Sequence, residues 1–481
     1  MATLTVKEIV DATGGRVIYG GPEGTFFSGV SIDSRSIGEG ELFIALKGKS
    51  FDGHDFFMNA MEKGRGAVVS APPVAPARGK TVIHVKNTLK ALQDIARSVR
   101  LKRRATVIGI TGTNGKTTTK EIIASILGIQ HRVMKNSGNF NNQIGLPLSL
   151  AGMEDGDEFA VMEMGASMRG DIKELCDIAV PDYGVITNVG PGHLEGFGSL
   201  EVVRSTKLEL YDAVKAIALN ADDLFLMEGV AERTGRSDGP VIITFGMNGT
   251  ADVYARDIEP GHRHSAFALC TGDKCVDITM NVPGRFNISN ALAAASVCTA
   301  LGIGPEEIKK GIESFTGIPM RLEFKDLFGA EIISDVYNAN PASMEEAVKE
   351  LVRLRKGRAI AVLGDMLELG ACAEEAHRRL GRWMSGLPVD VLIAVGEMME
   401  KTAEEFSASR GRNPESGRVV VVSGSAEARK VLLGICREGD TVLVKGSRGM
   451  KMERVLENSA GIFCGSPGDA ATGMKEIGNA L

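Results

Sequence analysis

The sequence predicts an α/β protein with mostly parallel sheets, and three stretches of the chain carry that prediction. Residues 107–127 have the pattern of a buried strand, a glycine-rich turn and a helix. Strands then alternate with helices from 158 to 220, and a second alternation runs from 331 to 445. This alternation is typical of parallel strands covered by helices. A chain of 481 residues is also long enough for two to four domains.

The first hundred residues mix short strands with glycine turns. Thr5 and Glu8 have the spacing of a capping box, which predicts a helix at the N-terminus. Further along we expect strands within 30–35 and 40–46, a proline-rich loop at 71–76 and an amphipathic helix over 88–101.

The rest of the chain divides near Ile318. Before it we expect strands at 158–163, 183–188 and 216–220, helices at 200–213 and 288–301, and hairpins between 241 and 282. After it we expect a second doubly wound domain, with strands at 331–336, 358–363, 389–395, 418–423 and 440–445. The glycine-rich tail after Cys464 is expected to be a loose C-terminus.

Composition excludes several classes of protein. A net charge of −6 argues against a nucleic-acid surface, and the basic run 100–104 is interpreted as a solvated linker. The seven cysteines lack a C-x-x-C pair, which indicates a reducing cytosol without disulfides or a zinc site. Cys270 and Cys275 are interpreted as two positions in a hairpin around 271–273. No signal peptide and no run of 18 apolar residues is present, so we expect neither export nor a membrane span.

The glycine-rich turn after the first buried strand is typical of a polyphosphate site. Gly112 and Gly115 let backbone N–H groups approach phosphate oxygens, and the following helix directs its positive end at the same anion. Lys116 can reach the β- and γ-phosphates, and the Thr117 hydroxyl can bind Mg²⁺. The generic G-x-x-x-x-G-K-[ST] pattern has a glycine where this chain has Ile110, so the turn is a variant of that loop.

Polar residues also stand where the next central strands end. Glu163 ends one strand, Asn188 ends another, and His193 follows within six residues. Ligands of open α/β sheets bind at the carboxyl ends of strands, so Glu163 and His193 are candidate magnesium ligands. Taken singly, Glu163 would be a solvated strand-end acid and His193 an ordinary loop histidine.

Three further polar residues admit two interpretations each. Lys207 lies on the expected helix 200–213, where an exposed helical lysine is the simpler interpretation. Asn287 and Asn290 begin the helix after Phe286, and spacing alone does not separate helix capping from nucleotide contact.

Together these residues resemble the Mur ligase family of ATP-dependent peptidoglycan-precursor ligases. The matching motifs are Thr111–Thr117, Glu163–Gly165, Asn188–His193, the Asn287/Asn290 pair, Arg321–Glu323 and Asp335–Pro341. The resemblance implies a small α/β UDP-substrate-binding domain at 1–103, a central P-loop ATPase domain with a mostly parallel sheet at 104–317, and a C-terminal Rossmann-like ligase domain at 318–481.

The resemblance also implies roles for individual residues. Lys116, Glu163, His193 and Lys207 would be catalytic, and Thr117, Glu163, His193 and a carbamylated Lys207 would hold two Mg²⁺ ions. Ser34 and Arg35 would face the uridine diphosphate. The expected ATP contacts are Gly112, Thr113, Asn114, Gly115, Lys116, Thr117, Thr118, Asn287, Asn290, Arg321, Asp335 and Asn338.

Several stretches are similar to the family member that joins D-alanyl-D-alanine to UDP-N-acetylmuramoyl-tripeptide. These are Asn139–Pro147, Tyr337–Met344 and Gly364–Gly370. The resemblance implies an amide ligation through an acyl phosphate in a cytoplasmic monomer, with no nucleic-acid partner. The alternatives are the neighbouring ligase that adds the third residue, a folylpolyglutamate synthase-like ligase, and a non-catalytic nucleotide-binding regulator. The neighbour's Asp-Asn-Pro-Arg signature is absent.

Overall fold

The computed structural model describes residues 3–20, 24–48, 51–71, 79–234, 239–410 and 417–457. They form two compact units. The first unit comprises the described residues up to Gly190 together with Gly196–Thr316. The second comprises Pro191–Glu195 and the described residues from Gly317 onward. No described helix has the length and apolar character needed to cross a bilayer.

The N-terminal part of the first unit is a small α/β layer. Its five-stranded sheet has the order β2-β7-β6-β5-β4, in which only the β2–β7 pair is antiparallel, and β1 pairs with β3. The strands are β1 Leu4–Thr5, β2 Arg16–Tyr19, β3 Phe26–Phe27, β4 Val30–Ser31, β5 Leu42–Ile44, β6 Gly66–Val69 and β7 Thr81–His84. The helices are α1 Val6–Thr13, α2 Phe57–Lys63 and α3 Thr88–Lys102.

The central part of the first unit is built on a nine-stranded sheet of order β16-β15-β14-β13-β12-β11-β8-β10-β9. From β9 to β14 neighbouring strands are parallel, and β14, β15 and β16 are antiparallel. The strands are β8 Thr106–Thr111, β9 Val133–Lys135, β10 Phe159–Glu163, β11 Tyr183–Ile186, β12 Ala216–Asn220, β13 Val241–Gly246, β14 Val253–Pro260, β15 Ser265–Thr271 and β16 Lys274–Met280. Because the parallel strands are covered on both faces, β8 and β12 are almost continuously apolar and buried.

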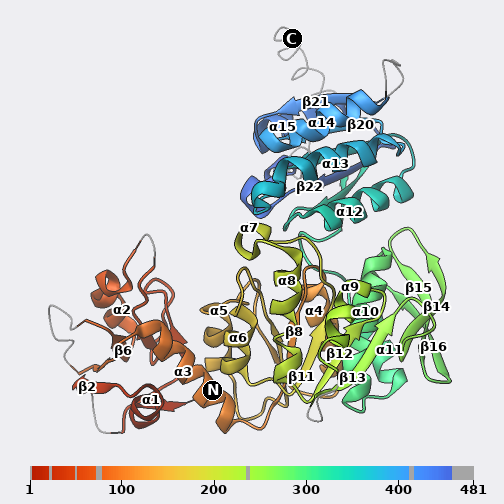
Figure 1. The fold of residues 1–481 in the computed structure, drawn as a ribbon. Coiled ribbons are helices and arrows are strands. Elements are labelled where there is room, and N and C mark those ends of the chain that lie inside the picture. Colours follow the sequence, from red (N-terminus) through yellow and green to blue (C-terminus); the bar gives the residue numbers. More distant parts are fainter. Residues whose placement is uncertain are drawn as a thin grey trace. The chain divides into compact units, whose positions relative to one another are not determined.

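Helices cover both faces of this sheet (Figure 1). One layer contains α4, α10 and α11, and the other contains α5, α6, α8 and α9. The helices of this part are α4 Lys116–Leu127, α5 Gly145–Ala151, α6 Asp171–Ala179, α8 Leu200–Lys207, α9 Leu224–Ala231, α10 Arg285–Ala300 and α11 Pro305–Ser314. The short helix α7 Leu194–Phe197 begins in the segment Pro191–Glu195 that groups with the second unit.

Helix α4, which begins at the phosphate loop, packs closely on α11. Gly311 lies against the backbone of Ile126, where an added Cβ would be 2.3 Å from the Ile126 Cα. The Ser125 hydroxyl donates to the Gly311 carbonyl at 2.8 Å. The C-terminal end of α4 is therefore fixed by a contact that admits no side chain at position 311.

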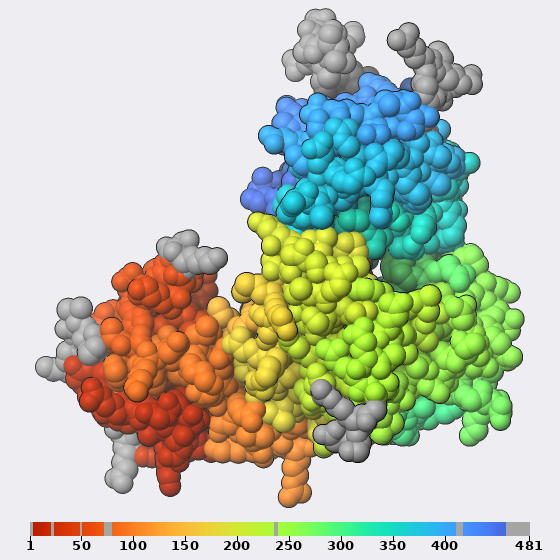
Figure 2. Space-filling view, viewed as in Figure 1, coloured from red at the N-terminus to blue at the C-terminus, as the bar shows by residue number. Residues whose placement is uncertain are grey.

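The second unit is a doubly wound α/β layer. Its sheet has the order β17-β18-β22-β19-β20-β21, and only β17 is antiparallel to its neighbour. Helices α12, α13 and α14 share an apolar core on one face, and α15 shares another core on the opposite face. The elements are β17 Glu323–Leu327, β18 Ala330–Asp335, β19 Ala359–Gly364, β20 Val391–Val395, β21 Arg418–Val422, β22 Thr441–Lys445, α12 Pro341–Leu354, α13 Ala373–Ser385, α14 Glu397–Arg410 and α15 Ser425–Ile435. Figure 2 shows the visible surface of this unit in teal and blue, because it comes from the last third of the chain.

Most expected elements are confirmed within two or three residues. The strand expected within 30–35 covers only Val30–Ser31, and one helix is shorter than expected. The segment 200–213 forms α8, which ends at Lys207, followed by a separate 3-10 turn at Tyr211–Ala213. The Thr5/Glu8 capping box is present, with Glu8 N–H donating to the Thr5 hydroxyl and Thr5 N–H to the Glu8 carboxylate. Most of the proline-rich loop and the tail after Cys464 lie outside the described residues.

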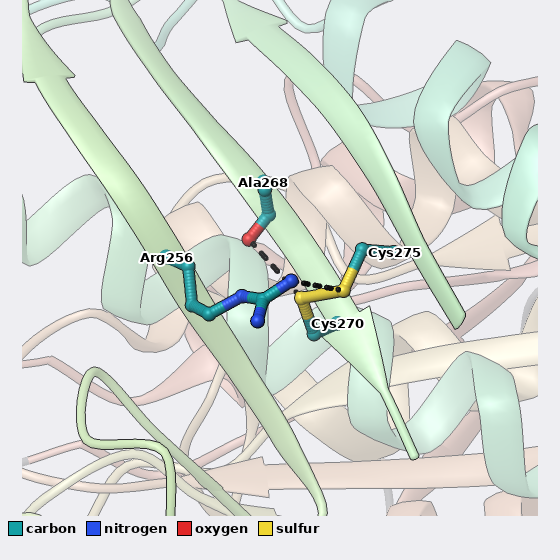
Figure 3. Close-up of a disulfide and its surroundings, with 4 residues drawn as sticks. All are labelled: Arg256, Ala268, Cys270 and Cys275. Atoms are coloured by element: carbon teal, nitrogen blue, oxygen red, sulfur yellow. Dashed lines mark hydrogen bonds between the residues drawn. A yellow bond between two sulfur atoms is a disulfide. The ribbon is translucent and has the colours of Figure 1, made fainter. Parts of the chain in front are cut away.

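The expectation of unpaired cysteines is wrong at one place. Cys270 and Cys275 form a disulfide between β15 and β16 (Figure 3). The expected hairpin is confirmed, and its turn places the two residues directly opposite each other, with Cα atoms 4.1 Å apart. That spacing is typical of a close antiparallel pair, in which the side chains meet on one face. Sequence spacing alone therefore concealed a spatial pair.

The interpretation of the basic run 100–104 as a solvated linker is wrong for Arg100. This residue lies in the last turn of α3 and is 8% exposed. Its guanidinium donates to the carbonyls of Ala105, Ala179 and Val180 and to the Asp182 carboxylate, the last at 2.7 Å. The end of α3 is thereby tied to the strand that carries the phosphate loop and to the segment before β11.

Replacing Arg100 with alanine is expected to destabilise the first unit by about 3 kcal/mol, because it leaves buried carbonyls and a carboxylate without their donor. Urea unfolding followed by fluorescence or circular dichroism measures the change. Arg104→Ala, at an exposed position in the same run, is the matched control and should shift the midpoint little. Equal midpoints for the two variants would contradict the structural role of Arg100.

Candidate functional site

The phosphate loop joins β8 to α4 at the carboxyl edge of the central sheet. Gly112 and Gly115 have φ angles of 148° and 84°, which disfavour residues with a side chain. A Cβ on Gly112 would lie 1.9 Å from the Thr187 hydroxyl oxygen. Gly115 caps α4, whose first residue is Lys116. The Lys116 ammonium donates to the carbonyls of Gly112 and Thr113 at 2.9 and 3.1 Å, so the lysine folds back over the loop.

Residues after β11 hold this loop in place. The Asn188 side chain accepts from Asn114 N–H at 2.9 Å and donates to the Asn114 carbonyl at 3.1 Å. The Thr187 hydroxyl donates to the same carbonyl at 2.6 Å. The Thr113 hydroxyl bridges the two segments by donating to the Gly190 carbonyl and accepting from Gly190 N–H. The predicted approach of strand ends to the phosphate loop therefore holds for β11.

Glu163 ends β10, the strand next to β8, and is buried at 3% exposure. Its Oε1 accepts from the Asn141 amide at 2.8 Å, whereas its Oε2 is buried and has no hydrogen-bond partner. The Asn136 side chain accepts from Glu163 N–H and donates to the Glu163 carbonyl. The alternative of a solvated strand-end acid is therefore wrong. A cation bound to Oε2 would offset the free-energy cost of burying this oxygen without a hydrogen bond.

Lys207 ends α8 and is buried at 4% exposure, so the alternative of an exposed helical lysine is wrong. Burial, together with the positive charge of Lys116, lowers the pKa of the Lys207 ammonium well below its usual range. This shift favours the neutral amine, which is a nucleophile, more than in an exposed lysine.

The helix-capping alternative for Asn287 and Asn290 is also wrong. Helix α10 starts at Arg285 with Gly284 as its N-cap. The Asn287 amide donates to the Pro283 carbonyl at 2.7 Å, and Asn290 is buried one turn further along. A Cβ on Gly115 would lie 2.2 Å from Asn290 Oδ1. Asn290 therefore contacts the phosphate loop directly.

His193 belongs to the segment that groups with the second unit. It has a left-handed backbone, with a φ of 53°, and its Nδ1 lies 2.6 Å from a Glu368 carboxylate oxygen. The alternative of an ordinary loop histidine in hydrogen-bonded surroundings fits this contact. A role as a metal ligand stays a prediction.

The remaining expected nucleotide contacts lie at or near the carboxyl edge of the second unit's sheet. Asp335 and Lys445 are paired at the ends of β18 and β22, and the Lys445 ammonium donates to Asp335 at 2.5 Å and to the Asn338 carbonyl at 3.0 Å. The Arg321 guanidinium carbon lies 4.3 Å from the centroid of the Tyr337 ring. Asp335 is thus held by a buried ion pair, which its sequence motif did not predict.

Ser34 and Arg35 follow β4 in the N-terminal part of the first unit. The Arg35 guanidinium makes a bidentate contact with Asp33 at 2.9 and 2.6 Å. Hydrogen bonds from Arg35 lower the pKa of the Asp33 carboxyl to about 2. The Arg35 side chain is 88% exposed, so it remains open to an anionic ligand.

Sequence reasoning assigned no role to the residues that hold the site residues in place, namely Asn136, Asn141 and Lys445. Asn136 and Asn141 stand on the loop between β9 and α5, where four of the five residues 139–143 are Asn or Gln, a composition that is common in turns. The usable signal was the stretch Asn139–Pro147, which the resemblance had singled out. Lys445 ends a predicted strand, as Glu163 does, and the rule applied to the central sheet would have found it.

Comparisons with known proteins agree with this geometry. Residues 110–298 match the model of the Mur ligase middle domain, and 320–448 match the Mur ligase, glutamate ligase domain. Residues 27–100 match the Mur ligase family, catalytic domain. The chain is 36% identical over 466 residues to the UDP-N-acetylmuramoyl-tripeptide–D-alanyl-D-alanine ligase of Bacillus subtilis, covering 95% of this chain and 98% of the relative.

Solved structures of Mur ligases also match this chain. A crystal structure of MurF from Acinetobacter baumannii matches with a TM-score of 0.87 at 30% identity, covering 95% of this chain and 99% of that one. The MurF ligase of Thermotoga maritima in complex with ADP matches with a TM-score of 0.76 at 30% identity, covering 89% and 96%. The predicted fold class, a three-domain α/β protein with mostly parallel sheets, is confirmed. The chain belongs to the Mur ligase family.

Proposed function

We propose that this chain is an ATP-dependent ligase that joins D-alanyl-D-alanine to UDP-N-acetylmuramoyl-tripeptide. The observation that carries the proposal is one edge of the central sheet, where the phosphate loop, the buried Glu163 and the buried Lys207 occur together. A loop for ATP alone would suit many enzymes. A buried acid and a buried amine beside it suit phosphoryl transfer to a carboxylate, and the relatives named above carry this activity in their names.

We assign a separate binding role to each of three proposed domains, 1–103, 104–317 and 318–481. The three family models match 27–100, 110–298 and 320–448, which supports these boundaries. We assign uridine diphosphate recognition to Ser34 and Arg35 in the first. We assign ATP recognition to the loop from Gly112 to Thr118, with Asn287 and Asn290, in the second. Arg321, Asp335 and Asn338 remain proposed nucleotide contacts of the third.

The chain offers a suitable set of ligands for Mg²⁺. The orphan Oε2 of Glu163 is a hard, anionic oxygen, and the Thr117 hydroxyl at the start of α4 is a second oxygen donor. Magnesium typically takes one or two protein ligands and completes its shell with phosphate oxygens and water. When bound, the ion would neutralise phosphate charge. His193 is proposed as a further ligand on the resemblance alone.

Lys207 is proposed to carry a carbamate. A buried neutral amine attacks the carbon of CO₂, forms an N–C bond and releases a proton, which converts a potential cation into an anion. The lowered pKa of Lys207 supports this reaction, because an ammonium has no lone pair to donate. An anion here would favour a second Mg²⁺, whereas an ammonium would repel it.

The chemistry follows from the difficulty of activating a carboxylate. The carboxylate of the tripeptide attacks the γ-phosphorus of ATP, ADP leaves, and an acyl phosphate forms. The amine of D-alanyl-D-alanine then attacks the acyl carbon, and the tetrahedral intermediate expels phosphate to give the amide. Lys116 and the loop N–H groups offset the charge that develops on the transferred phosphoryl group. Asn141 and Asn136 fix the orientation of Glu163.

We further propose that the enzyme acts in the cytoplasm as a monomer. Its proposed co-substrate ATP and its UDP-linked acceptor are cytoplasmic metabolites, which supports that location.

A substrate-selection assay tests the proposal. Purified chain is incubated with ATP and Mg²⁺, and ADP release is measured with UDP-muramoyl-tripeptide plus D-alanyl-D-alanine. Parallel reactions contain UDP-muramoyl-dipeptide plus diaminopimelate, or folate plus glutamate. We expect ADP release with the first pair only. Release with either other pair would favour the corresponding alternative ligase. Measurable ATP binding without ADP release in any reaction would favour the non-catalytic regulator.

Replacing Asn141 with alanine is expected to raise the Mg²⁺ concentration needed for half-maximal activity by about tenfold, because Glu163 loses the charge-assisted hydrogen bond that orients it. Activity should recover at high Mg²⁺. Binding of Mn²⁺ measured by electron paramagnetic resonance gives a readout that does not depend on turnover. Asn139→Ala, at an exposed position in the same loop, is the control. An unchanged Mg²⁺ requirement would exclude a positioning role for Asn141.

A further inference from the structure

The disulfide between β15 and β16 lies on an open face of the central sheet's antiparallel end. Arg256 on β14 is paired with Ala268 on β15, and Cys270 is paired with Cys275 on β16. Alternate residues of a strand point to the same face, so Arg256, Cys270 and Cys275 share one face. Residues of the opposite parity, including Leu269 and Ile278, are buried.

The two sulfur atoms of this pair differ in access. Cys270 is fully buried at 0% exposure, because it lies on the inner strand, whereas Cys275 is exposed. An incoming thiol or disulfide can therefore meet Cys275 and cannot meet Cys270. This asymmetry is typical of a pair in which one sulfur reacts with an external molecule and the other resolves the product.

A cation lies next to the accessible sulfur. The Arg256 guanidinium reaches across β15, and its Nη2 lies 3.2 Å from Cys275 Sγ (Figure 3). A guanidinium in this position stabilises a thiolate, which is the reactive form of cysteine. Asp273 and Asp277 flank Cys275 along the chain, and Lys274 stands at the turn. Arg256 is the charged group whose contact with the sulfur the structure defines.

We propose that Cys270 and Cys275 form a thiol–disulfide exchange site that takes low-molecular-weight disulfides as oxidants and dithiols as reductants. Cys275 is the attacking residue and Cys270 the resolving residue. The site is separate from the phosphate loop and independent of the proposed ligase activity.

The oxidation balances in two steps. The Cys275 thiolate attacks one sulfur of R–S–S–R, so that a Cys275–S–R bond forms and one RS⁻ leaves. Cys270 then loses its proton and attacks Cys275 Sγ, which forms the protein disulfide and releases the second RS⁻. Two protein thiols are oxidised and one external disulfide is reduced to two thiols. Reduction by a dithiol runs the same steps in reverse, with first attack on the exposed Cys275.

The chain's other described cysteines provide internal references. Burial raises the pKa of Cys176 to about 12 and raises that of Cys298 further. Burial also raises the pKa of Cys436 to about 11. Cys372 is exposed and forms no disulfide, and it stands at the N-cap of α13, so it serves as an internal standard for an accessible thiol outside the 270–275 hairpin.

The first experiment follows glutathionylation. Reduced full-length chain is treated with oxidised glutathione, and each cysteine is examined by peptide mass spectrometry. We expect the parent to form the 270–275 disulfide without a lasting adduct at either residue. Cys270→Ser should retain a glutathione adduct on Cys275, and Cys275→Ser should show none on Cys270. A lasting adduct on Cys275 of the parent, or none in Cys270→Ser, would overturn the assignment.

The second experiment measures the role of Arg256. Reduced parent and Arg256→Gln are alkylated at neutral pH, and the rates at Cys275 and Cys372 are compared. With Cys372 as the internal standard, we expect the relative rate at Cys275 to be several-fold higher in the parent than in Arg256→Gln. Equal relative rates in the two proteins would exclude activation of the Cys275 thiolate by Arg256. Circular dichroism and ADP release serve as checks that each variant is folded, because none of the three residues belongs to the proposed catalytic machinery.

Discussion

Lys116→Ala is expected to reduce ADP release by about 10³-fold or more, since the variant lacks the cation that offsets charge on the transferred phosphoryl group. The free energy of unfolding should change by about 1 kcal/mol at most. The ammonium makes two hydrogen bonds to loop carbonyls, and its loss costs stability.

Steady-state ADP release and urea unfolding measure the two quantities for Lys116→Ala. Lys173→Ala, an exposed lysine on α6 of the same unit, is the matched control and should retain parental activity. Near-parental ADP release from Lys116→Ala would refute the assignment of the loop. A large loss of stability would instead mean that the lysine is a structural part of the loop.

Lys207→Ala is the second change with a large expected effect. The variant lacks the amine that is proposed to become an anion, and we expect turnover to fall by about 10³-fold. Short carboxylic acids such as acetate or formate should restore part of the activity, because they can place a carboxylate in the space that the side chain leaves. Chloride at equal ionic strength is the control for a general salt effect.

Rescue of Lys207→Ala separates two explanations of inactivity. A merely structural lysine would give a variant that no small acid restores. Full activity of the variant without additive would leave only a packing role for Lys207. The same titration of acetate with Lys116→Ala should give no recovery, because that position requires a cation.

The sequence predicted the central sheet well because its strands are apolar runs that end in polar residues. Glu163 and Asn188 both follow that rule, and the structure places Glu163 in a buried position beside the loop strand. The burial of residues on helices was harder to predict. Lys207 has the surroundings of an exposed lysine in sequence, and only the packing of α8 buries it.

Local sequence patterns could not predict which side chains from distant segments contact each other. The burial of Arg100 depends on carbonyls some 80 residues away, and Asp335 meets Lys445 across more than 100 residues. The 270–275 disulfide depends on a two-residue turn that sets the register of the strands. Each is a question of which strands become neighbours, and spacing along one chain does not contain that information.

The position of helix α4 is limited by close contacts at two glycines. At its first turn Gly115 leaves room for Asn290, and near its last turn Gly311 leaves room for Ile126. A helix of this length spans about 18 Å. At each of its ends the neighbouring element lies too close to leave room for a methyl group on the glycine. A shift of this helix would disturb close contacts at both of its ends, because a methyl group added at Gly115 or Gly311 would already overlap its neighbour. The backbone position of Lys116 therefore depends also on the opposite end of its helix, where Gly311 packs against Ile126.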